Sequence, residues 1–131
     1  MPNPEHLRPR NPDQPVILIA EDEAAIRNLA RIALEDAGYF VLTAENGEVA
    51  LSLSKQYADQ IHVLLTDVVM PKMGGMELSK RMSTERPGIR VVLMSGHSFA
   101  ESINPEYPFL QKPFLPNQLS NTIKALLPGG A

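Results

Sequence analysis

Apolar and polar residues follow one another along the chain in blocks of two kinds. Blocks of the first kind are short apolar runs, and three of them are rich in β-branched side chains. Nearly continuous apolarity over so few residues predicts strands that are buried on both faces of a parallel sheet. The predicted strands are Val16–Ala20, Phe40–Ala44, His62–Thr66, Ile89–Met94 and Phe109–Gln111.

Blocks of the second kind carry apolar residues at helical spacing and lie between the predicted strands. The apolar positions of the first block are Ile26, Leu29, Ala30, Ala33 and Ala37. Gly38 ends this helix, because glycine readily adopts the left-handed backbone found just beyond helix C-termini. Asn46 is predicted to be the N-cap of the second helix. The apolar positions of that helix are Val49, Ala50, Leu53 and Tyr57.

Three further helices are predicted in the second half of the chain. Leu78 and Met82 lie four residues apart in the third helix, which must end before the Pro-Gly pair that follows. Ser98 and Glu101 match the capping box that opens helices, but Pro105 breaks the pattern within about two turns. We therefore expect a shortened fourth helix. The apolar positions of the last helix are Leu115, Leu119, Ile123 and Leu126.

The order of these elements predicts the fold class. Strands that alternate with helices through short links form a parallel sheet with right-handed crossovers and helices on both faces. We expect an α/β fold with a doubly wound, five-stranded parallel sheet in the flavodoxin-like order 2-1-3-4-5. The domain is expected to span residues 16–127. Residues 1–15 read as a flexible N-terminal tail or linker, and residues 128–131 as a C-terminal tail.

Composition narrows the range of functions. The chain has 131 residues, of which 44% are hydrophobic and 21% charged, with a formal net charge of −3. It has no basic stripe of the kind that binds phosphates, so direct nucleic-acid binding is not expected. The absence of cysteine excludes disulfides and thiolate metal sites. No apolar run approaches the length that spans a bilayer, so we expect no membrane insertion and a cytoplasmic protein.

Chemically reactive side chains follow four of the five predicted strands. Glu21 and Asp22 follow the first strand, Asp67 the third, Ser95 the fourth and Lys112 the fifth. Each residue has an ordinary explanation by itself, as a turn former, a helix cap or a solvated surface group. These separate explanations do not predict that all five meet, whereas a parallel sheet brings the carboxyl ends of its strands to one edge.

A cluster of this composition suits phosphoryl transfer. Neighbouring carboxylates repel one another unless a cation lies among them, and hard oxygen ligands suit Mg²⁺, with Mn²⁺ a possible substitute. An ammonium group can pair with a carboxylate or with a phosphoryl oxygen, and a hydroxyl can donate to a remaining oxygen. A carboxylate between a cation and a lysine is then a nucleophile for phosphorus, which gives an aspartyl phosphate.

Four short motifs in this order resemble the receiver domain of two-component response regulators and hybrid histidine kinases. The resemblance covers about residues 15 to 127. Any one motif is weak evidence, but four at the ends of the predicted strands are specific. The motifs are Glu21-Asp22-Glu23, Leu64-Leu65-Thr66-Asp67-Val68-Val69-Met70-Pro71, Val92-Leu93-Met94-Ser95-Gly96 and Gln111-Lys112-Pro113-Phe114.

The resemblance implies a role for each residue of the cluster. Asp67 is expected to accept the phosphoryl group from a phosphohistidine. Mg²⁺ is expected to bind Asp22, Asp67 and the backbone carbonyl of Val69. Glu21 stands where the family most often has aspartate, and it is expected to act through water. Lys112 is expected to hold the carboxylate and then the phosphoryl group.

The resemblance also implies a conformational switch. Ser95 is expected to move toward the phosphoryl group, and Phe109 to rotate into the space that Ser95 leaves. The ordinary alternative for Phe109 is a core side chain. The bond between Lys112 and Pro113 is expected to be cis, as in the family. His97 either lies over the site or faces solvent.

The partner implied by the resemblance is a histidine kinase or a histidine phosphotransfer domain. It is expected to bind near Ala24–Asn28 and Phe114–Asn117, and the chain is expected to be a monomer or weak dimer. Two alternatives remain at this point. One is an interaction module that does not depend on phosphorylation. The other is an aspartyl-phosphate phosphatase, although Val69 stands where that class needs a second aspartate.

Overall fold

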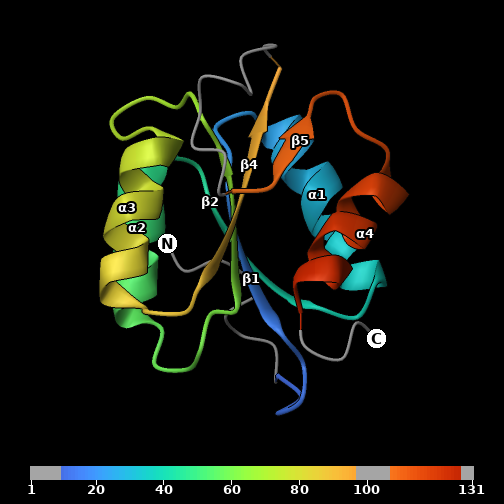
Figure 1. Cartoon of the computed structure of the whole chain (residues 1–131), viewed down its shortest axis with the longest axis horizontal. Coiled ribbons are helices and arrows are strands. Elements are labelled where there is room, and N and C mark those ends of the chain that lie inside the picture. The colour runs from blue at the N-terminus through green and yellow to red at the C-terminus, as the bar shows by residue number, and fades with distance from the viewer. Residues whose placement is uncertain (1–9, 97–106, 128–131) are drawn as a thin grey trace.

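The computed structural model describes residues 10–96 and 107–127, and its centre is a five-stranded parallel sheet (Figure 1). The strands lie in the order β2-β1-β3-β4-β5, which confirms the predicted topology. Adjacent strands pair in parallel throughout the sheet. The strands are β1 (Val16–Ala20), β2 (Phe40–Ala44), β3 (Val63–Asp67), β4 (Arg90–Ser95) and β5 (Phe109–Gln111).

Helices cover both faces of the sheet, as a doubly wound fold requires. In Figure 1, α2 and α3 lie on one side of the sheet and α1 and α4 on the other, and each pair closes its own apolar cluster. No helix in the described part of the chain is both long and apolar enough to cross a membrane. The helices are α1 (Ala24–Asp36), α2 (Gly47–Gln56), α3 (Gly75–Glu85) and α4 (Pro116–Leu126).

The label α4 therefore belongs to the last of the helices that the sequence predicts. The shortened fourth helix, expected to start at Ser98, lies outside the described residues and stays a prediction. The extent of the two tails stays a prediction as well. Residues 10–15 form a turn in which the Arg10 Nε donates to the carbonyl of Gln14 at 3.0 Å. Pro15 then accepts a hydrogen bond from the backbone N–H of Phe40 at 2.9 Å.

Two strands begin and end one residue later than the apolar pattern predicts. The apolar run ends before Thr66 in β3 and after Met94 in β4, but backbone pairing continues beyond Thr66 and Met94. Asp67 pairs with Met94, and Ser95 pairs with Gln111. Ladder hydrogen bonds use only main-chain groups, so a polar side chain can occupy the last paired position. This extension places Asp67 and Ser95 on rigid strand ends rather than in loops.

The predicted helix faces need two corrections. In α1 the fully buried residues are Ala30 and Leu34, while Leu29 is 44% exposed. In α2 the predicted core residue Val49 is 38% exposed, while Leu51 is buried. Spacing defines an apolar stripe along a helix, but the direction from which the sheet meets that helix decides which edge of the stripe is covered.

The N-terminus of α2 is capped as predicted, and that of α4 has a contact that the sequence analysis missed. The Asn46 Oδ1 accepts a hydrogen bond from the backbone N–H of Val49 at 2.9 Å. Gly74 and Leu115 occupy the N-cap positions of α3 and α4 without a capping side-chain bond. At α4 the backbone N–H of Leu115 instead donates to the Gln118 Oε1 at 2.7 Å, which satisfies one exposed donor at the helix start.

The first turn of α3 packs directly against the end of β3. The backbone N–H of Gly75 donates to the carbonyl of Val68 at 2.9 Å, and the Ser79 Oγ donates to the carbonyl of Gly75 at 2.6 Å. A Cβ atom at position 75 would lie 2.1 Å from the backbone oxygen of Asp67. Only glycine therefore allows α3 to approach β3 this closely.

We predict that Gly75→Ala destabilises the fold by about 2–3 kcal/mol, because the added methyl group must displace main-chain atoms. Chemical denaturation monitored by circular dichroism measures this change. The matched control is Gly96→Ala, since a Cβ there meets no described atom within 4 Å. Equal stabilities of the two variants would contradict the close approach of Gly75 to Asp67.

At the amino ends of β1 and β3, a hydrogen bond depends on the protonation state of a histidine. The His62 Nδ1 accepts from the backbone N–H of Val16 at 3.0 Å, so this imidazole must be neutral. Burial lowers the pKa of His62 below its ordinary value of 6.5, and the nearby Arg10 guanidinium lowers it further. Below pH 6.5 the unfolded chain therefore takes up a proton before the folded chain does, and stability falls as the pH falls toward the folded pKa.

We predict that the free energy of unfolding decreases between pH 7.5 and pH 5, by about 1.4 kcal/mol for each unit by which the His62 pKa is lowered. In His62→Asn an amide oxygen can accept from Val16 without titrating, so this part of the pH dependence should disappear. Urea denaturation of both proteins across the pH range tests the prediction. The same pH dependence in both would exclude His62 as its source.

Candidate functional site

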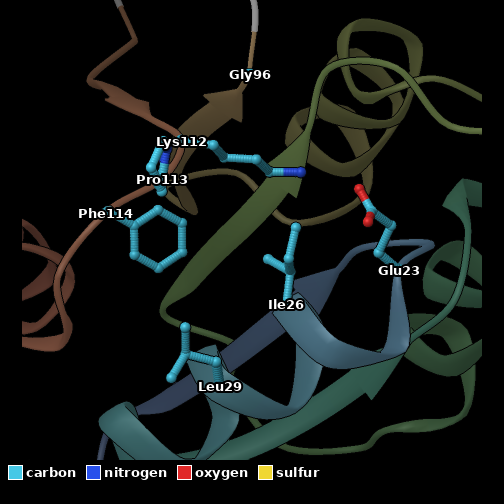
Figure 2. A pocket seen from close by; sticks show the side chains of 7 residues that line it. All are labelled: Glu23, Ile26, Leu29, Gly96, Lys112, Pro113 and Phe114. Atoms are coloured by element: carbon cyan, nitrogen blue, oxygen red, sulfur yellow. The ribbon is translucent and has the colours of Figure 1, made fainter.

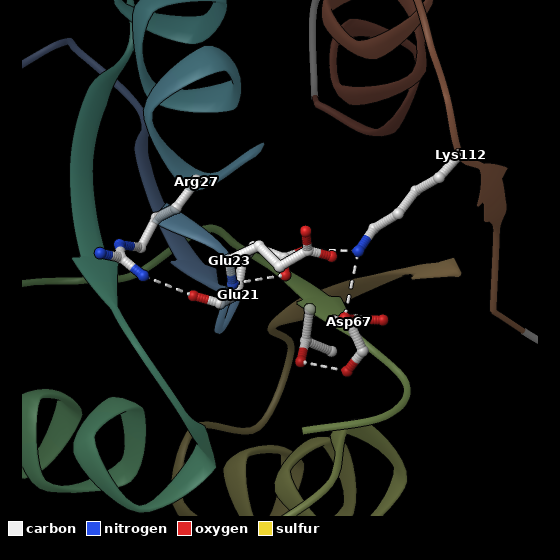
Figure 3. A network of polar contacts seen from close by, with 6 residues as sticks. Glu21, Glu23, Arg27, Asp67 and Lys112 are labelled. Atoms are coloured by element: carbon white, nitrogen blue, oxygen red, sulfur yellow. Dashed lines mark hydrogen bonds and ion pairs between the residues drawn. The ribbon is translucent and has the colours of Figure 1, made fainter. Parts of the chain in front are cut away.

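The turn between β1 and α1 holds Glu21 inside the protein. The backbone N–H of Glu21 donates to the carbonyl of Ala44 at 3.0 Å, and its own carbonyl accepts from the Arg27 Nη1 at 2.9 Å (Figure 3). The Glu21 Oε2 accepts from the backbone N–H of Glu23 at 3.0 Å. Glu21 is 0% exposed, whereas the next residue, Asp22, is exposed.

Asp67 is the last residue of β3, and its backbone is held on both sides. The Thr66 Oγ1 donates to the carbonyl of Asp67 at 2.9 Å. The next residue, Val68, donates its N–H to the carbonyl of Met94 in β4 at 3.0 Å. Asp67 as a whole is 7% exposed, so its carboxylate meets solvent only through a small opening. The main chain thus fixes where this carboxylate points.

Lys112 connects the ends of β1, β3 and β5. Its backbone N–H donates to the carbonyl of Ser95 at 2.9 Å, and its bond to Pro113 is cis, as predicted. The side chain extends over the sheet edge, so that its Nζ lies 2.6 Å from the Glu21 Oε1 and 3.1 Å from the Asp67 Oδ2 (Figure 3). The contact with Asp67 is an aligned hydrogen bond, while the contact with Glu21 is an ion pair.

Burial and charge shift the titration of this group of side chains. Desolvation raises the pKa of the buried Glu21 carboxyl above its ordinary value, against the opposing effect of Lys112 and of the Glu23 N–H. Burial by itself would lower the pKa of Lys112, but the contacts with Glu21 and Asp67 outweigh it and raise this pKa. The lysine is therefore charged at neutral pH and serves as counter-ion to the carboxylates.

Three carboxylates converge at this edge of the sheet. One oxygen each of Glu21, Asp22 and Asp67 lies within 4.8 Å of the other two. Oxygen ligands of this kind, with an exposed side toward water, match the preferences of Mg²⁺. The residues present therefore fit a divalent cation.

A small pocket opens beside this cluster. It has a volume of about 220 Å³, and Ser95 contributes to its wall although only 1% of that residue is exposed. Val69 also borders the pocket, with 59% of its surface exposed. The pocket is lined by Asp22, Glu23, Asp67, Val69, Ser95, Gly96 and Lys112.

Phe109 does not line this pocket, but it lies on the neighbouring strand, on the face of the sheet that also carries Ser95. It pairs with Leu93 on β4 and packs, half-buried, on the apolar cluster of α2 and α3. Because side chains alternate along a strand, Ser95 projects to the same face of β4 as Leu93. Ser95 and Phe109 therefore share one face of the sheet.

A second, apolar pocket of about 410 Å³ adjoins the first. Figure 2 shows Ile26 and Leu29 of α1 facing Phe114 across it, with Lys112 and Glu23 along its rim. Helical spacing assigns Leu29 to the core-facing stripe of α1 and therefore does not predict this pocket. The exposed position of Leu29 follows from how α1 meets the β5–α4 connection, and spacing along one helix carries no signal of it.

Two further contributors were missed, and one predicted candidate lies outside the described residues. Glu23 borders both pockets, and its place in the acidic motif after β1 was the available signal. Thr66 orients the carbonyl of Asp67, and the only signal in the sequence was a polar residue after the apolar run and directly before Asp67. His97 falls in the part of the chain that the structure does not describe.

Relatives of the chain include both free-standing and kinase-attached proteins. It is 35% identical over 117 residues to the response regulator receiver protein CpdR of Brucella abortus (strain 2308), covering 85% of this chain and 95% of that protein. It is 34% identical over 116 residues to the sensor kinase CckA of the same strain, covering 85% of this chain. The chain spans only 12% of that kinase.

Solved structures show the same fold. The receiver domain of the hybrid histidine kinase CckA superposes with a TM-score of 0.75 at 34% identity, covering 86% of this chain and 98% of that one. The response regulator TrrA of Thermotoga maritima, in complex with Mg²⁺ and BeF, superposes with a TM-score of 0.75 at 27% identity. This match covers 87% of this chain and 100% of that one.

The family comparison covers most of the domain. Residues 17–124 match the response regulator receiver domain. This range includes every residue of the acidic cluster, Ser95 and Lys112. The chain therefore belongs to the response regulator receiver domains, which act as phosphoryl acceptors in two-component signalling.

Proposed function

We propose that Asp67 accepts a phosphoryl group from a phosphohistidine on a histidine kinase or a histidine phosphotransfer domain. The observation that carries the proposal is the position of the Lys112 ammonium, 3.1 Å from the Asp67 Oδ2 in a cluster that includes the carboxylates of Glu21 and Asp22. A nucleophilic carboxylate beside a fixed positive charge is what phosphoryl transfer requires, because this reaction depends on positioning and on stabilisation of charge.

We propose that the site takes Mg²⁺, with Mn²⁺ as a possible substitute. Asp22, Asp67 and the backbone carbonyl of Val69 would hold the ion directly. The exposure of Asp22 and the position of Val69 on the pocket wall support this assignment. When bound, the ion neutralises negative charge on the phosphoryl oxygens.

In the transfer step, a carboxylate oxygen of Asp67 forms a bond to phosphorus while the bond between phosphorus and the histidine nitrogen breaks. The electron pair of the broken bond stays with the imidazole, whose other ring nitrogen carries a proton in the donor, so the ring leaves neutral. Lys112 contacts a phosphoryl oxygen as that oxygen approaches, so the ammonium that now faces Asp67 and Glu21 becomes the partner of the new anion. The low exposure of Asp67 limits attack by water on the product.

Ser95 and Phe109 are proposed to report the modification. Ser95 borders the pocket from the end of β4, so its hydroxyl can reach a phosphoryl oxygen there after a small movement. Phe109 is only half-buried on the same face of the sheet, so a rotation that packs the ring more deeply would bury more of its apolar surface. In such a shift the protein changes from one packing arrangement to another of similar free energy.

The partner is proposed to bind at the start of α1, near Ala24–Asn28, and at the β5–α4 connection, near Phe114–Asn117. The apolar pocket lies between these two segments and opens next to Lys112. An apolar side chain from the helix that carries the phosphohistidine would fill it and align the donor with Asp67.

The proposed function predicts covalent modification at a single residue. Incubation with acetyl phosphate and Mg²⁺ should add the mass of one phosphoryl group to the intact protein. Asp67→Asn should abolish the gain, because an amide is not a nucleophile for phosphorus. Asp36→Asn, at an exposed position of α1, is the matched control and should be modified as the wild type is.

The outcomes separate the remaining alternatives. An interaction module that does not depend on phosphorylation would show no gain in mass. A phosphatase would release phosphate from a generic phosphoester over many turnovers. Removal of Mg²⁺ with a chelator should slow the modification at least tenfold. A gain that persists in Asp67→Asn would place the phosphoacceptor elsewhere.

The switch predicts a change at Phe109 that depends on Ser95. Beryllofluoride with Mg²⁺, a stand-in for the phosphoryl group, should shift the ring signals of Phe109 in spectra of protein carrying labelled phenylalanine. The signals are assigned by their loss in Phe109→Leu. Ser95→Ala should bind beryllofluoride, seen by fluorine NMR, yet show less than half of this shift. Ser52→Ala, at an exposed position of α2, should behave as wild type, and an undiminished shift in Ser95→Ala would refute the coupling.

A further inference from the structure

The turn between β1 and α1 carries three acidic residues in succession, and a guanidinium group is bonded to its main chain. The Arg27 Nη1 donates to the carbonyl oxygen of Glu21 at 2.9 Å. Figure 3 shows Arg27 and Lys112 on opposite sides of Glu21. Lys112 contacts the carboxylate of Glu21, whereas Arg27 contacts the backbone. The two cations therefore act on different parts of the turn.

The bond from Arg27 fixes the peptide group that leads into Asp22. The carbonyl of Glu21 and the N–H of Asp22 belong to one planar peptide, so a held oxygen also sets the plane from which Asp22 continues. The backbone N–H of Glu21 is held in turn by the carbonyl of Ala44 at 3.0 Å. Asp22 is exposed, so packing contributes little to its position. The main chain of the turn therefore decides where its carboxylate points.

The N-terminus of α1 lacks the capping side chain that α2 has. Glu23 is the N-cap of α1 and makes no capping bond with its side chain, and the first turn of α1 contains no acidic residue. The backbone N–H of Arg27 donates to the carbonyl of Glu23 at 2.9 Å, within the first hydrogen-bonded turn of the helix. Its side chain folds back to Glu21, before the N-cap. Arg27 thus joins the start of the helix to the acidic turn.

We infer that Arg27 is a positioning residue for the phosphoryl-transfer site, because its guanidinium holds the β1–α1 turn in the conformation that directs the Asp22 carboxylate to the cation. The inference rests on the proposed function, in which Asp22 helps to hold a divalent ion. Arg27 lines neither of the two pockets described above, so it acts through the turn and not on the ion or the phosphoryl group. Loss of a group that orients a metal ligand typically weakens metal binding by about tenfold or more.

The charge of Arg27 acts on the cation in the opposite direction to its hydrogen bond. A positive charge near a cation site repels the ion, so removal of the charge alone should tighten Mg²⁺ binding. Loss of the hydrogen bond should weaken binding, because the Asp22 carboxylate then samples directions away from the ion. Arg27→Gln removes the charge and leaves a side chain too short to reach the Glu21 carbonyl. The sign of the change in affinity therefore separates positioning from charge.

The first experiment measures the Kd for Mg²⁺ by calorimetry, on variants that circular dichroism shows to be folded. Arg27→Gln should raise this Kd by about tenfold. The matched control is Arg31→Gln, which removes the same charge one turn further along α1, where the guanidinium pairs with Glu35. The Kd of this control should stay within about twofold of the wild-type value. An unchanged or lower Kd in Arg27→Gln overturns the inference.

The second experiment compares the rate of modification by acetyl phosphate at two Mg²⁺ concentrations. At a Mg²⁺ concentration equal to the wild-type Kd, a tenfold weaker site is filled about fivefold less, so Arg27→Gln should react about fivefold more slowly. At saturating Mg²⁺ its rate should return to within about twofold of wild type, because Arg27 acts only on the placement of the ion. An equal loss of rate at both concentrations overturns the inference.

A third measurement uses the cation-free wild type and so does not depend on the folding of a variant. NMR relaxation gives an order parameter for the Nε–H group of each arginine, which is high for a fixed side chain and low for a mobile one. Arg27 should be more ordered than Arg81, whose side chain is 53% exposed. Equal or lower order at Arg27 overturns the inference. A wild type that binds no Mg²⁺ would count against the proposed function instead, and this order parameter would still decide whether Arg27 holds the turn.

Discussion

The constraint on which this protein depends is the repulsion between acidic side chains gathered at one edge of a sheet. Glu21, Asp22 and Asp67 each offer an oxygen within 4.8 Å of the others, and two of the three residues are buried. Buried like charges are tolerated only when positive charge lies among them. Lys112, which follows β5, supplies part of that charge, and the divalent ion proposed for the site would supply the rest. The ion binding and the phosphoryl acceptance proposed for this site would thus have one electrostatic origin.

The sheet is what makes such a cluster possible. Its strands are parallel, so their carboxyl ends share one edge, and residues far apart in sequence meet there. Asp67 and Ser95 are the last paired residues of their strands, which gives both a rigid backbone. Close packing of α3 then fixes the Asp67 peptide. Gly75 has no side chain, so the helix backbone can lie directly against the end of the strand. The precise position of the Asp67 carboxylate therefore comes from main-chain contacts, while the neighbouring pocket remains open.

The two faces of the sheet serve different purposes. The face under α2 and α3 carries Ser95 and Phe109, which are proposed to respond to phosphorylation. The α1 side carries the apolar pocket proposed for the partner. Lys112 lies at the boundary, because it borders both pockets and contacts Asp67. A partner that fills the apolar pocket would therefore lie directly beside the reacting group.

The sequence alone determined the order of elements, the parallel sheet and the edge at which the candidate residues converge, because alternating apolar runs and helical stripes admit few topologies. It identified Glu21, Asp22, Asp67, Ser95 and Lys112 as neighbours for the same reason. Only the tertiary structure decided that Leu29 and Val49 are exposed, that Thr66 and Gly75 fix the Asp67 backbone, and that Glu21 pairs with Lys112. The local pattern of the sequence shows which residues are apolar, and it locates the ends of the strands to within about one residue. Contacts between segments distant in sequence depend on how helices meet the sheet and how far side chains reach across it, and no local pattern records those distances.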